Sequence, residues 1–509
     1  MSQASTEEMI HRFEAAESSL LDISPFTVIF CLISLLSFYF SFRIFKMVKQ
    51  QNKLLQQNSQ KAAEPNYEYD EPEGVLRRRQ SRDRDTRIRT NQNIYRICIT
   101  GGPCAGKTTS LATLRSQLQE KGYMVLEVPE AATMMMKGGC FIQTSSMSFS
   151  QAVKFQISLM QMQMHLEDVF IEIGINSCQP CVVLMDRGVM DGSAYTSPKI
   201  WKAILNETDW TTIQLRDRRY DAVIHLVTAA DGAEEFYGKN NEARYETIEQ
   251  AKEVDSKLIN AWTGHPHFKI IDNHHEGGFK GKIQEILKTV TKHIGLPDTA
   301  FVQRKFLLMQ DGEGRFIINE PTGLKRETFE VEEIFLAPRG TEEIESKIRS
   351  RGKEDSYTYI HESKTVVKGE EIIRKRQISA REFIQLSDQK IENTSPVEKI
   401  RHCFIYKNQN FVVDVFKSIK GNPIILRLET DTKSDEISIP PFVKVCKEVT
   451  GEDFPIYTTN VMSRRDYEMP PEDIERCRMN LDIDAGLGMG KKNSISIWNM
   501  KDDDATIQE

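Results

Sequence analysis

The chain has 509 residues, which at about 150 residues per domain predicts two to four domains with full-sized cores. Hydrophobic residues make up 39% and charged residues 28%, with only 28 Gly and 18 Pro, a balance that excludes collagen-like and wholly disordered proteins. The net charge of -7 argues against a general nucleic-acid binder. Nine scattered Cys are typical of reduced thiols rather than of a secreted disulfide framework.

A transmembrane anchor is expected at residues 23–46, after an N-terminal tail at 1–22. Residues 23–42 carry no charge and would span about 30 Å as a helix, enough to cross a bilayer core. Several Ser and Thr dilute the segment, so an interfacial segment or a signal peptide is the alternative. Acidic residues precede the segment, and Arg43, Lys46 and Lys49 follow it. The positive-inside rule therefore predicts a single-pass membrane protein with its C-terminal bulk in the cytosol.

Residues 47–93 predict a disordered, basic tether. The segment is rich in Gln and Asn, then acidic, and then rich in Arg, with no apolar period. Seven Arg and two Asp between 77 and 89 make its end locally basic, so it is suited to touch anionic lipid beside the anchor. A charge run that is merely solvated is the alternative.

A phosphate-binding loop follows a short buried strand predicted at 95–100. Residues 101–108 satisfy the pattern G-x-x-x-x-G-K-[ST], and an apolar stripe then predicts a helix. In such a loop Lys107 reaches the β- and γ-phosphates, and Thr108 ligates Mg²⁺. The expected nucleotide-binding residues are Gly101, Gly102, Pro103, Cys104, Ala105, Gly106, Lys107, Thr108 and Thr109.

Further candidates for the catalytic machinery follow other predicted strands. Asp186 ends the apolar run 181–186 and is the expected carboxylate beside the metal, a simple helix cap in the next loop being the alternative. Arg187 comes next and is suited to neutralise phosphate charge, or to form a surface ion pair. Glu130 lies two residues after the run 124–128 and could accept a proton from a substrate hydroxyl or position a water, or it simply begins the next helix. Arg244 leads a polar helical stretch and is expected to stabilise transferred phosphate charge as part of a lid, a solvated helix face being the alternative.

Apolar runs alternate with helical patterns throughout residues 94–296. Two more strand-like runs lie at 222–227 and 268–273. This alternation predicts an α/β P-loop NTPase domain with a parallel, doubly wound sheet, of the nucleoside-kinase-like kind.

Strand-rich segments with recurring basic residues characterise residues 297–485. Charges two residues apart on a strand point to one face, and in a closed antiparallel barrel that face can be the lumen. Basic side chains would then converge on a polyanion, whereas an exposed basic sheet face is the alternative. The candidates for binding an anion or a lipid headgroup are Lys305, Arg349, Arg351, Lys364, Arg376 and Arg401. A disordered tail is expected at 486–509.

A P-loop domain followed by this strand pattern resembles the translocation-defect family, known from the trafficking of a photoreceptor channel. The likeness covers about residues 94–485. In the first half it rests on the P-loop, on Asp186-Arg187-Gly188 and on Ile271-Asp272-Asn273. In the second half it rests on Arg304-Lys305-Phe306, Arg349-Ser350-Arg351, Lys364, Arg401, Asp414 and Glu429.

The resemblance implies an AAA-type P-loop domain fused to a CYTH-like barrel, that is, a triphosphate-tunnel α+β fold. It further implies binding of GTP with Mg²⁺, recognition of a phosphoinositide such as phosphatidylinositol 3-phosphate, and a role in the traffic of a membrane protein. No Asn-Lys-x-Asp quartet occurs in the chain, so the preference for guanine over ATP rests on the resemblance alone.

Two departures from catalytic tunnel enzymes favour a binding barrel. Those enzymes begin with Glu-x-Glu-x-Lys, whereas this chain has Phe301-Val302-Gln303-Arg304-Lys305, without either acid. Near the last strand, Arg427-Leu428-Glu429 retains one acid where a pair is expected. Since a metal-assisted phosphohydrolase needs carboxylates, a triphosphatase in the barrel is disfavoured. A small-molecule kinase or an ATPase that uses Glu130 as base is the other alternative to a GTP-binding trafficking protein, and a weak GTPase or NTPase activity is left open.

Overall fold

The structure is a computed structural model that describes residues 94–478, apart from short gaps, and the pair 496–497. The gaps are 141–146, 238–246, 297–301, 311–315, 319–320, 322, 339–342, 368–369, 431–436 and 452. The predicted anchor at 23–46, the tether at 47–93 and Arg244 lie outside the described residues. The chain divides into two units, 1–79 and 80–509, and everything described here belongs to the second. Within the described residues, no helix combines the length and apolar character needed to cross a bilayer.

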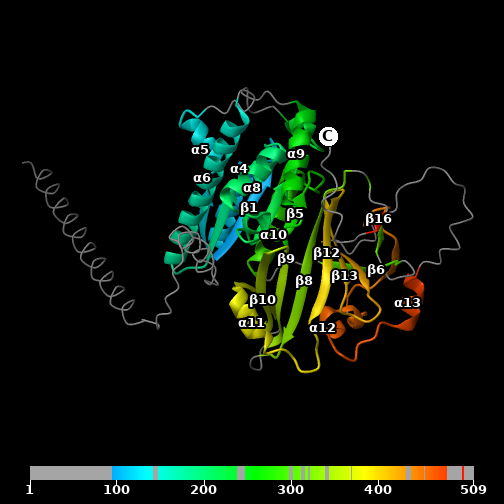
Figure 1. Ribbon diagram of the computed structural model, residues 1–509. Helices are drawn as coiled ribbons and strands as arrows, with labels where there is room; N and C mark the ends of the chain where they lie inside the picture. The colour runs from blue at the N-terminus through cyan, green and yellow to red at the C-terminus, as the bar shows by residue number, and fades with distance from the viewer. Residues whose placement is uncertain are drawn as a thin grey trace, which may run out of the picture. The chain divides into compact units, whose positions relative to one another are not determined.

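A five-stranded, all-parallel sheet organises the first domain (Figure 1). Its strands, in the spatial order β2-β3-β1-β4-β5, are β1 (Ile94–Gly101), β2 (Met124–Val128), β3 (Cys181–Asp186), β4 (Ala222–Leu226) and β5 (Phe268–Ile271). The connecting helices are α4 (Lys107–Glu120), α5 (Ala131–Lys137), α6 (Phe149–Asn176), α7 (Asp191–Ala194), α8 (Pro198–Thr208), η2 (Ile213–Asp217), η3 (Glu234–Phe236), α9 (Ile248–Trp262) and α10 (Phe279–His293).

Helices cover both faces of this sheet, because its strands are apolar on both sides. Along β1, Ile97 and Ile99 enter the cluster that contains the α4 and α10 leucines and isoleucines, while Cys98 enters the cluster with α6 and α9. A fully buried parallel sheet needs this kind of continuous apolar run. The prediction of a parallel, doubly wound P-loop sheet is confirmed.

The second domain contains a nine-stranded antiparallel sheet in the order β11-β10-β9-β8-β12-β13-β14-β6-β15 (Figure 1). The strands are β6 (Val302–Leu308), β8 (Arg326–Leu336), β9 (Glu343–Lys353), β10 (Ser356–Val367), β11 (Glu370–Ile378), β12 (Val397–Tyr406), β13 (Gln409–Phe416), β14 (Ile424–Thr430) and β15 (Val445–Glu448). The helices are α11 (Ala380–Ser387), η4 (Pro455–Tyr457), α12 (Thr459–Met462) and α13 (Pro471–Cys477).

Strand register places ionisable side chains on one face of this sheet. Lys305 lies opposite Arg427, Arg401 opposite Asp414, and Glu362 opposite both Lys347 and Lys375. Directly paired residues of an antiparallel ladder point to the same side. We call this side the charged face; its members are Lys305, Glu333, Lys347, Arg349, Arg351, Glu362, Lys375, Lys399, Arg401, Asp414 and Arg427.

The opposite side of the sheet packs in apolar clusters. Phe306, Phe404 and Leu426 belong to one such cluster, and α11 covers another around Ile348 and Phe383. The predicted antiparallel sheet is therefore present. Its ladder is linear, with β11 and β15 at the two edges and no pairing between those edges in the described residues, so closure into a barrel stays a prediction.

One short pair extends into the segment predicted to be a structureless tail. β16 (Ser496–Ile497) pairs antiparallel with β7 (Ile317–Ile318). The rest of 486–509 lies outside the described residues. A two-residue strand has no readable hydrophobic period, which is why the sequence pattern does not predict it.

Candidate functional site

The loop after β1 has the backbone shape of a phosphate-binding loop. Gly101 and Gly106 have φ values of 147° and 86°, and Cys104 also lies in the left-handed region at 54°. A Cβ at Gly101 would collide with the Leu226 carbonyl of the neighbouring strand β4. Glycine is therefore required where the chain leaves the sheet and where α4 begins. The N–H groups of the first turn of α4 are thereby directed at an anion.

Lys107 folds back over this loop. Its Nζ donates to the carbonyl oxygens of Gly101 at 3.0 Å and Gly102 at 3.2 Å. Burial and, to a lesser extent, the neighbouring Arg187 lower the pKa of Lys107 to about 8, while Asp186 opposes the shift. Thr108 and Thr109 are exposed on the first turn of α4. From this position the Lys107 ammonium group could exchange its hydrogen bonds to the Gly101 and Gly102 carbonyls for hydrogen bonds to phosphate oxygens.

Strand order places Asp186 beside the loop. β3 lies next to β1, with Asp186 in register with Ile99, two residues before Gly101. The Oδ1 atom of Asp186 is buried and has no hydrogen-bond partner among the described residues. Burial raises the pKa of Asp186, and Lys107 opposes that shift. An unpartnered buried carboxylate oxygen beside a P-loop fits Mg²⁺, which Thr108 and Asp186 would hold there, directly or through water.

Arg187 and Glu130 form an ion pair across the carboxyl edge of the sheet. Arg187 Nε lies 2.5 Å from Glu130 Oε1, and its NH1 group lies 3.4 Å from the Gly101 carbonyl and 3.6 Å from Asp191 Oδ2. Burial alone would raise the pKa of Glu130, but Arg187 and the hydrogen bond from Thr133 hold it below its ordinary value. Glu130 occupies the N-cap position of α5, but its side chain makes no capping hydrogen bond. The pair leaves a guanidinium next to the expected phosphate position.

Residues that sequence patterns did not single out hold the loop in place. Asp255 of α9 accepts from the Gly102 amide at 2.8 Å and from the Thr228 amide at 3.2 Å. Thr228 Oγ1 donates to the Pro103 carbonyl at 2.5 Å. Asp191 accepts from Thr100 at 2.8 Å and from the Trp262 indole at 2.6 Å. The partners are 27 to 153 residues apart in sequence, so no local motif marks them.

The anion candidates of the second domain divide into groups. Lys305, Arg349, Arg351, Lys364 and Arg401 share the parity of the charged face, whereas Arg376 lies on the other face and pairs with Glu382 of α11. The neighbouring Lys375 takes the charged-face position instead, at 3.8 Å from Glu362.

Acidic side chains offset many of these cations. Arg349 lies 2.9 Å from Glu333, Lys399 lies 3.3 Å from Glu333 and 3.4 Å from Asp414, and Arg401 lies 2.7 Å from Asp414. Despite burial, Arg401 and Arg427 hold the pKa of Asp414 well below its usual range. Of these acids, sequence reasoning missed Glu333.

Lys305 differs from these paired cations. Burial lowers its pKa, and Arg427 and Lys347 add to that shift. It lines a cavity of about 410 Å³ together with Gln303, Gly451, Pro455 and Thr458. The described part of the chain shows no ion pair to its ammonium group. Lys305 is therefore the candidate best placed to receive an external anion.

Arg351 points toward the first domain. Its guanidinium lies 2.8 Å from Asp217 of η2, donates to the Gly264 carbonyl and covers the Phe329 ring at 3.6 Å. Arg351 is 3% exposed, so it serves packing between domains rather than ligand capture.

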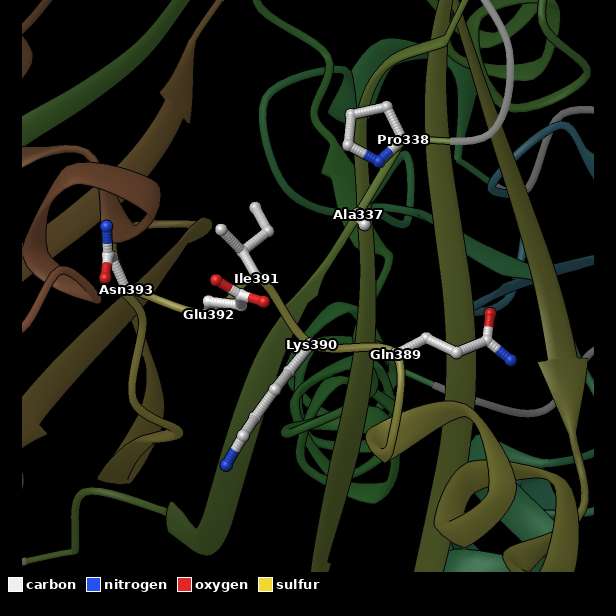
Figure 2. Close-up of a pocket in the computed structure, with 7 residues that line it drawn as sticks. All are labelled: Ala337, Pro338, Gln389, Lys390, Ile391, Glu392 and Asn393. Atoms are coloured by element: carbon white, nitrogen blue, oxygen red, sulfur yellow. The ribbon is translucent and has the colours of Figure 1, made fainter.

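A second, larger hollow contains none of the predicted site residues. It has a volume of about 690 Å³ and is lined by Ala337, Pro338 and 389–393. Figure 2 shows the Lys390 and Gln389 side chains pointing in different directions, so their polar groups do not converge on one point. Within the described residues, no group of three or more His, Cys, Asp or Glu side chains is placed to hold a metal ion.

Comparison with known proteins supports the nucleotide-binding domain. Residues 96–279 match the family model described as an AAA domain. No curated protein sequence matches the chain. Two solved structures, one of the inorganic triphosphatase NE1496 and one of the hypothetical protein NE1496, are 19% and 20% identical in sequence to this chain. They cover 34% of this chain and 98% and 100% of their own chains, both at a TM-score of 0.25. Residues 96–279 therefore form a P-loop nucleotide-binding domain of AAA type.

Proposed function

We propose that this protein binds a Mg²⁺–nucleoside triphosphate, GTP by preference, at residues 101–109, and a phosphoinositide headgroup on the charged face. We further propose that it acts at a membrane in the traffic of a membrane protein. One observation carries the nucleotide part: Lys107 Nζ lies against the Gly101 carbonyl at the end of β1, and the buried, unpartnered Oδ1 atom of Asp186 lies at the end of the adjacent strand β3. Guanine, the phosphoinositide and the trafficking role come from the family resemblance.

A competition titration on the full chain tests the nucleotide proposal. A fluorescent GTP analogue is displaced by unlabelled GTP or ATP with Mg²⁺ present, and GTP should compete more strongly. Lys107→Ala should weaken binding by about a hundredfold or more, because one charge-assisted phosphate contact is lost in a partly buried site. The matched control is Lys121→Ala at the exposed far end of α4, which should bind normally. Unchanged affinity in Lys107→Ala would refute the site.

The headgroup proposal rests on Lys305, whose ammonium group faces a cavity without an ion-pair partner among the described residues. Lys305→Ala should reduce binding to vesicles that contain phosphatidylinositol 3-phosphate by about tenfold. Arg376→Ala removes a cation from the same sheet but from its opposite face, where Glu382 already neutralises it. That variant should bind as the unchanged protein does. Equal losses in both variants would indicate non-specific charge attraction instead.

A small-molecule kinase is the second candidate, favoured by the Glu130–Arg187 pair at the carboxyl edge. Because its pKa is lowered, Glu130 would mainly orient an acceptor hydroxyl rather than remove its proton. Transfer of label from γ-labelled ATP to a nucleoside, lost in Glu130→Gln without loss of nucleotide affinity, would establish this activity. A triphosphatase on the charged face would instead release phosphate with Mg²⁺ even in Lys107→Ala.

A further inference from the structure

Two cysteines of the second domain lie in contact. The Sγ atoms of Cys446 and Cys477 are 3.0 Å apart, about 1 Å longer than a disulfide bond. Cys446 lies on the edge strand β15, and Cys477 ends α13. They are separated by 31 positions, so the contact is produced by the fold and not by a local motif.

Packing holds the two sulfurs at this distance. Cys477 is 1% exposed and Cys446 packs against the same cluster, which includes Leu307, Tyr457 and Met469. Asp473, one turn before Cys477, accepts from Tyr457 at 2.5 Å and from Lys447, beside Cys446, at 3.1 Å. Both segments that carry the thiols are therefore fixed on either side of the pair.

The two thiols differ in their access to solvent. Cys446 is partly exposed, whereas burial raises the pKa of the Cys477 thiol. A small oxidant therefore meets Cys446 first, and the buried partner is already within reach to resolve the adduct.

We propose that Cys446 and Cys477 form a reversible disulfide when the protein meets a low-molecular-weight disulfide such as oxidised glutathione. The Cys446 thiolate attacks one glutathione sulfur, forms a mixed disulfide and releases one glutathione thiolate. The Cys477 thiolate then attacks Cys446 Sγ, forms the protein disulfide and releases the second glutathione. Two protein thiols are oxidised, one glutathione disulfide is reduced to two thiols, and two protons leave the protein.

The bond would close a loop around part of the cavity beside Lys305. Gly451, Pro455 and Thr458 lie between the two cysteines and line that cavity. Oxidation would restrict the unfolded chain and tie α13 to β15, so the oxidised form should unfold at a higher temperature.

The test incubates the folded full-length protein with oxidised glutathione, alkylates remaining thiols and maps peptides without reduction. We expect a cross-linked peptide pair that contains Cys446 and Cys477, lighter by two hydrogen atoms than the two free peptides, and its disappearance after dithiothreitol. Cys446→Ser should lose both the cross-link and the rise in unfolding temperature. Cys178→Ser, at an exposed cysteine in the first domain, should retain both.

Peptide mapping of the unsubstituted protein decides the question even if a variant at buried Cys477 fails to fold. Alkylation of both Cys446 and Cys477 after oxidation would overturn the proposal. Accumulation of Cys446 as a stable glutathione adduct would overturn it as well, because the resolving step would then not occur.

Discussion

Burial makes the ammonium group of Lys107, the residue proposed to bind phosphate, easier to deprotonate. Its ammonium group lies against the Gly101 and Gly102 carbonyls, and its pKa falls to about 8. Bound phosphates would supply negative charge and raise that pKa again. Nucleotide binding therefore favours the protonated form of Lys107, and protonation of Lys107 favours nucleotide binding.

Nucleotide affinity should fall as the pH rises through about 8. Binding raises the pKa of Lys107. The contribution of its charge to nucleotide affinity is therefore complete below the pKa that Lys107 has in the free protein, and it is lost above that pKa by up to about tenfold per pH unit. Titrations from about pH 7 to about pH 9.5 measure this slope. Lys282, whose pKa burial also lowers to about 8, supplies the control: Lys282→Met should keep the slope. A flat profile in the unchanged protein would contradict the linkage.

At the scale of elements, α9 connects the P-loop to the rest of its domain. Asp255, in the middle of α9, accepts hydrogen bonds from the Gly102 and Thr228 amides. Trp262, at the end of α9, donates a hydrogen bond to Asp191. Each of these acceptors is buried, so removal of one leaves donors without water or protein partners. The helix thus positions both the loop and the carboxylate that faces Arg187.

Asp255→Ala should lower the free energy of unfolding by about 2–4 kcal/mol, because buried amides lose their acceptor. Nucleotide affinity should fall with it, since the loop loses its anchor at Gly102. Urea unfolding and the nucleotide titration measure the two effects. Glu253→Ala on the same helix removes a solvent-exposed acid and should change neither. A stable Asp255→Ala protein with normal affinity would show that α9 does not position the loop.

At the scale of the whole described chain, a buried charge pair joins the two domains. Arg351 on β9 meets Asp217 of η2 and the Gly264 carbonyl just after α9. Arg216 lies 3.7 Å from Glu327 of the second domain and donates to the Thr263 carbonyl of its own domain at 2.6 Å. Although burial opposes it, Arg216 and Arg351 hold the pKa of Asp217 below its ordinary value. The buried carboxylate of Asp217 is therefore kept ionised at this interface by the guanidinium groups of Arg216 and Arg351.

Arg351→Met should destabilise the protein by about 3 kcal/mol, because Asp217 would be left buried beside Arg216 alone. The two domains should then unfold in separate calorimetric transitions. Adding Asp217→Leu should recover part of the loss, which distinguishes the broken pair from lost packing. Arg381→Ala, at an exposed position on α11, is the control and should leave one cooperative transition. A single transition in Arg351→Met would mean that the pair does not hold the domains together.

Sequence alone determined the P-loop and the sheet that presents it, because the motif is contiguous and buried parallel strands are continuous apolar runs. It also located Asp186 and Glu130, each at the end of a strand. It could not find Asp191 or Asp255, since their partners come from distant elements. The strand pattern predicted an antiparallel domain, but it did not predict on which face of the sheet each basic side chain lies.

Only the tertiary structure decided those faces. Neighbouring residues of a strand point to opposite faces, so Lys375 faces Glu362 while Arg376 faces α11. A shift of one residue in register would exchange these two faces. Strand register likewise directs Arg351 to the first domain and Lys305 to a cavity, whereas the packing of α13 against β15 brings Cys477 to Cys446. Sequence supplies the identity and period of these side chains, whereas their partners depend on strand pairing over long separations.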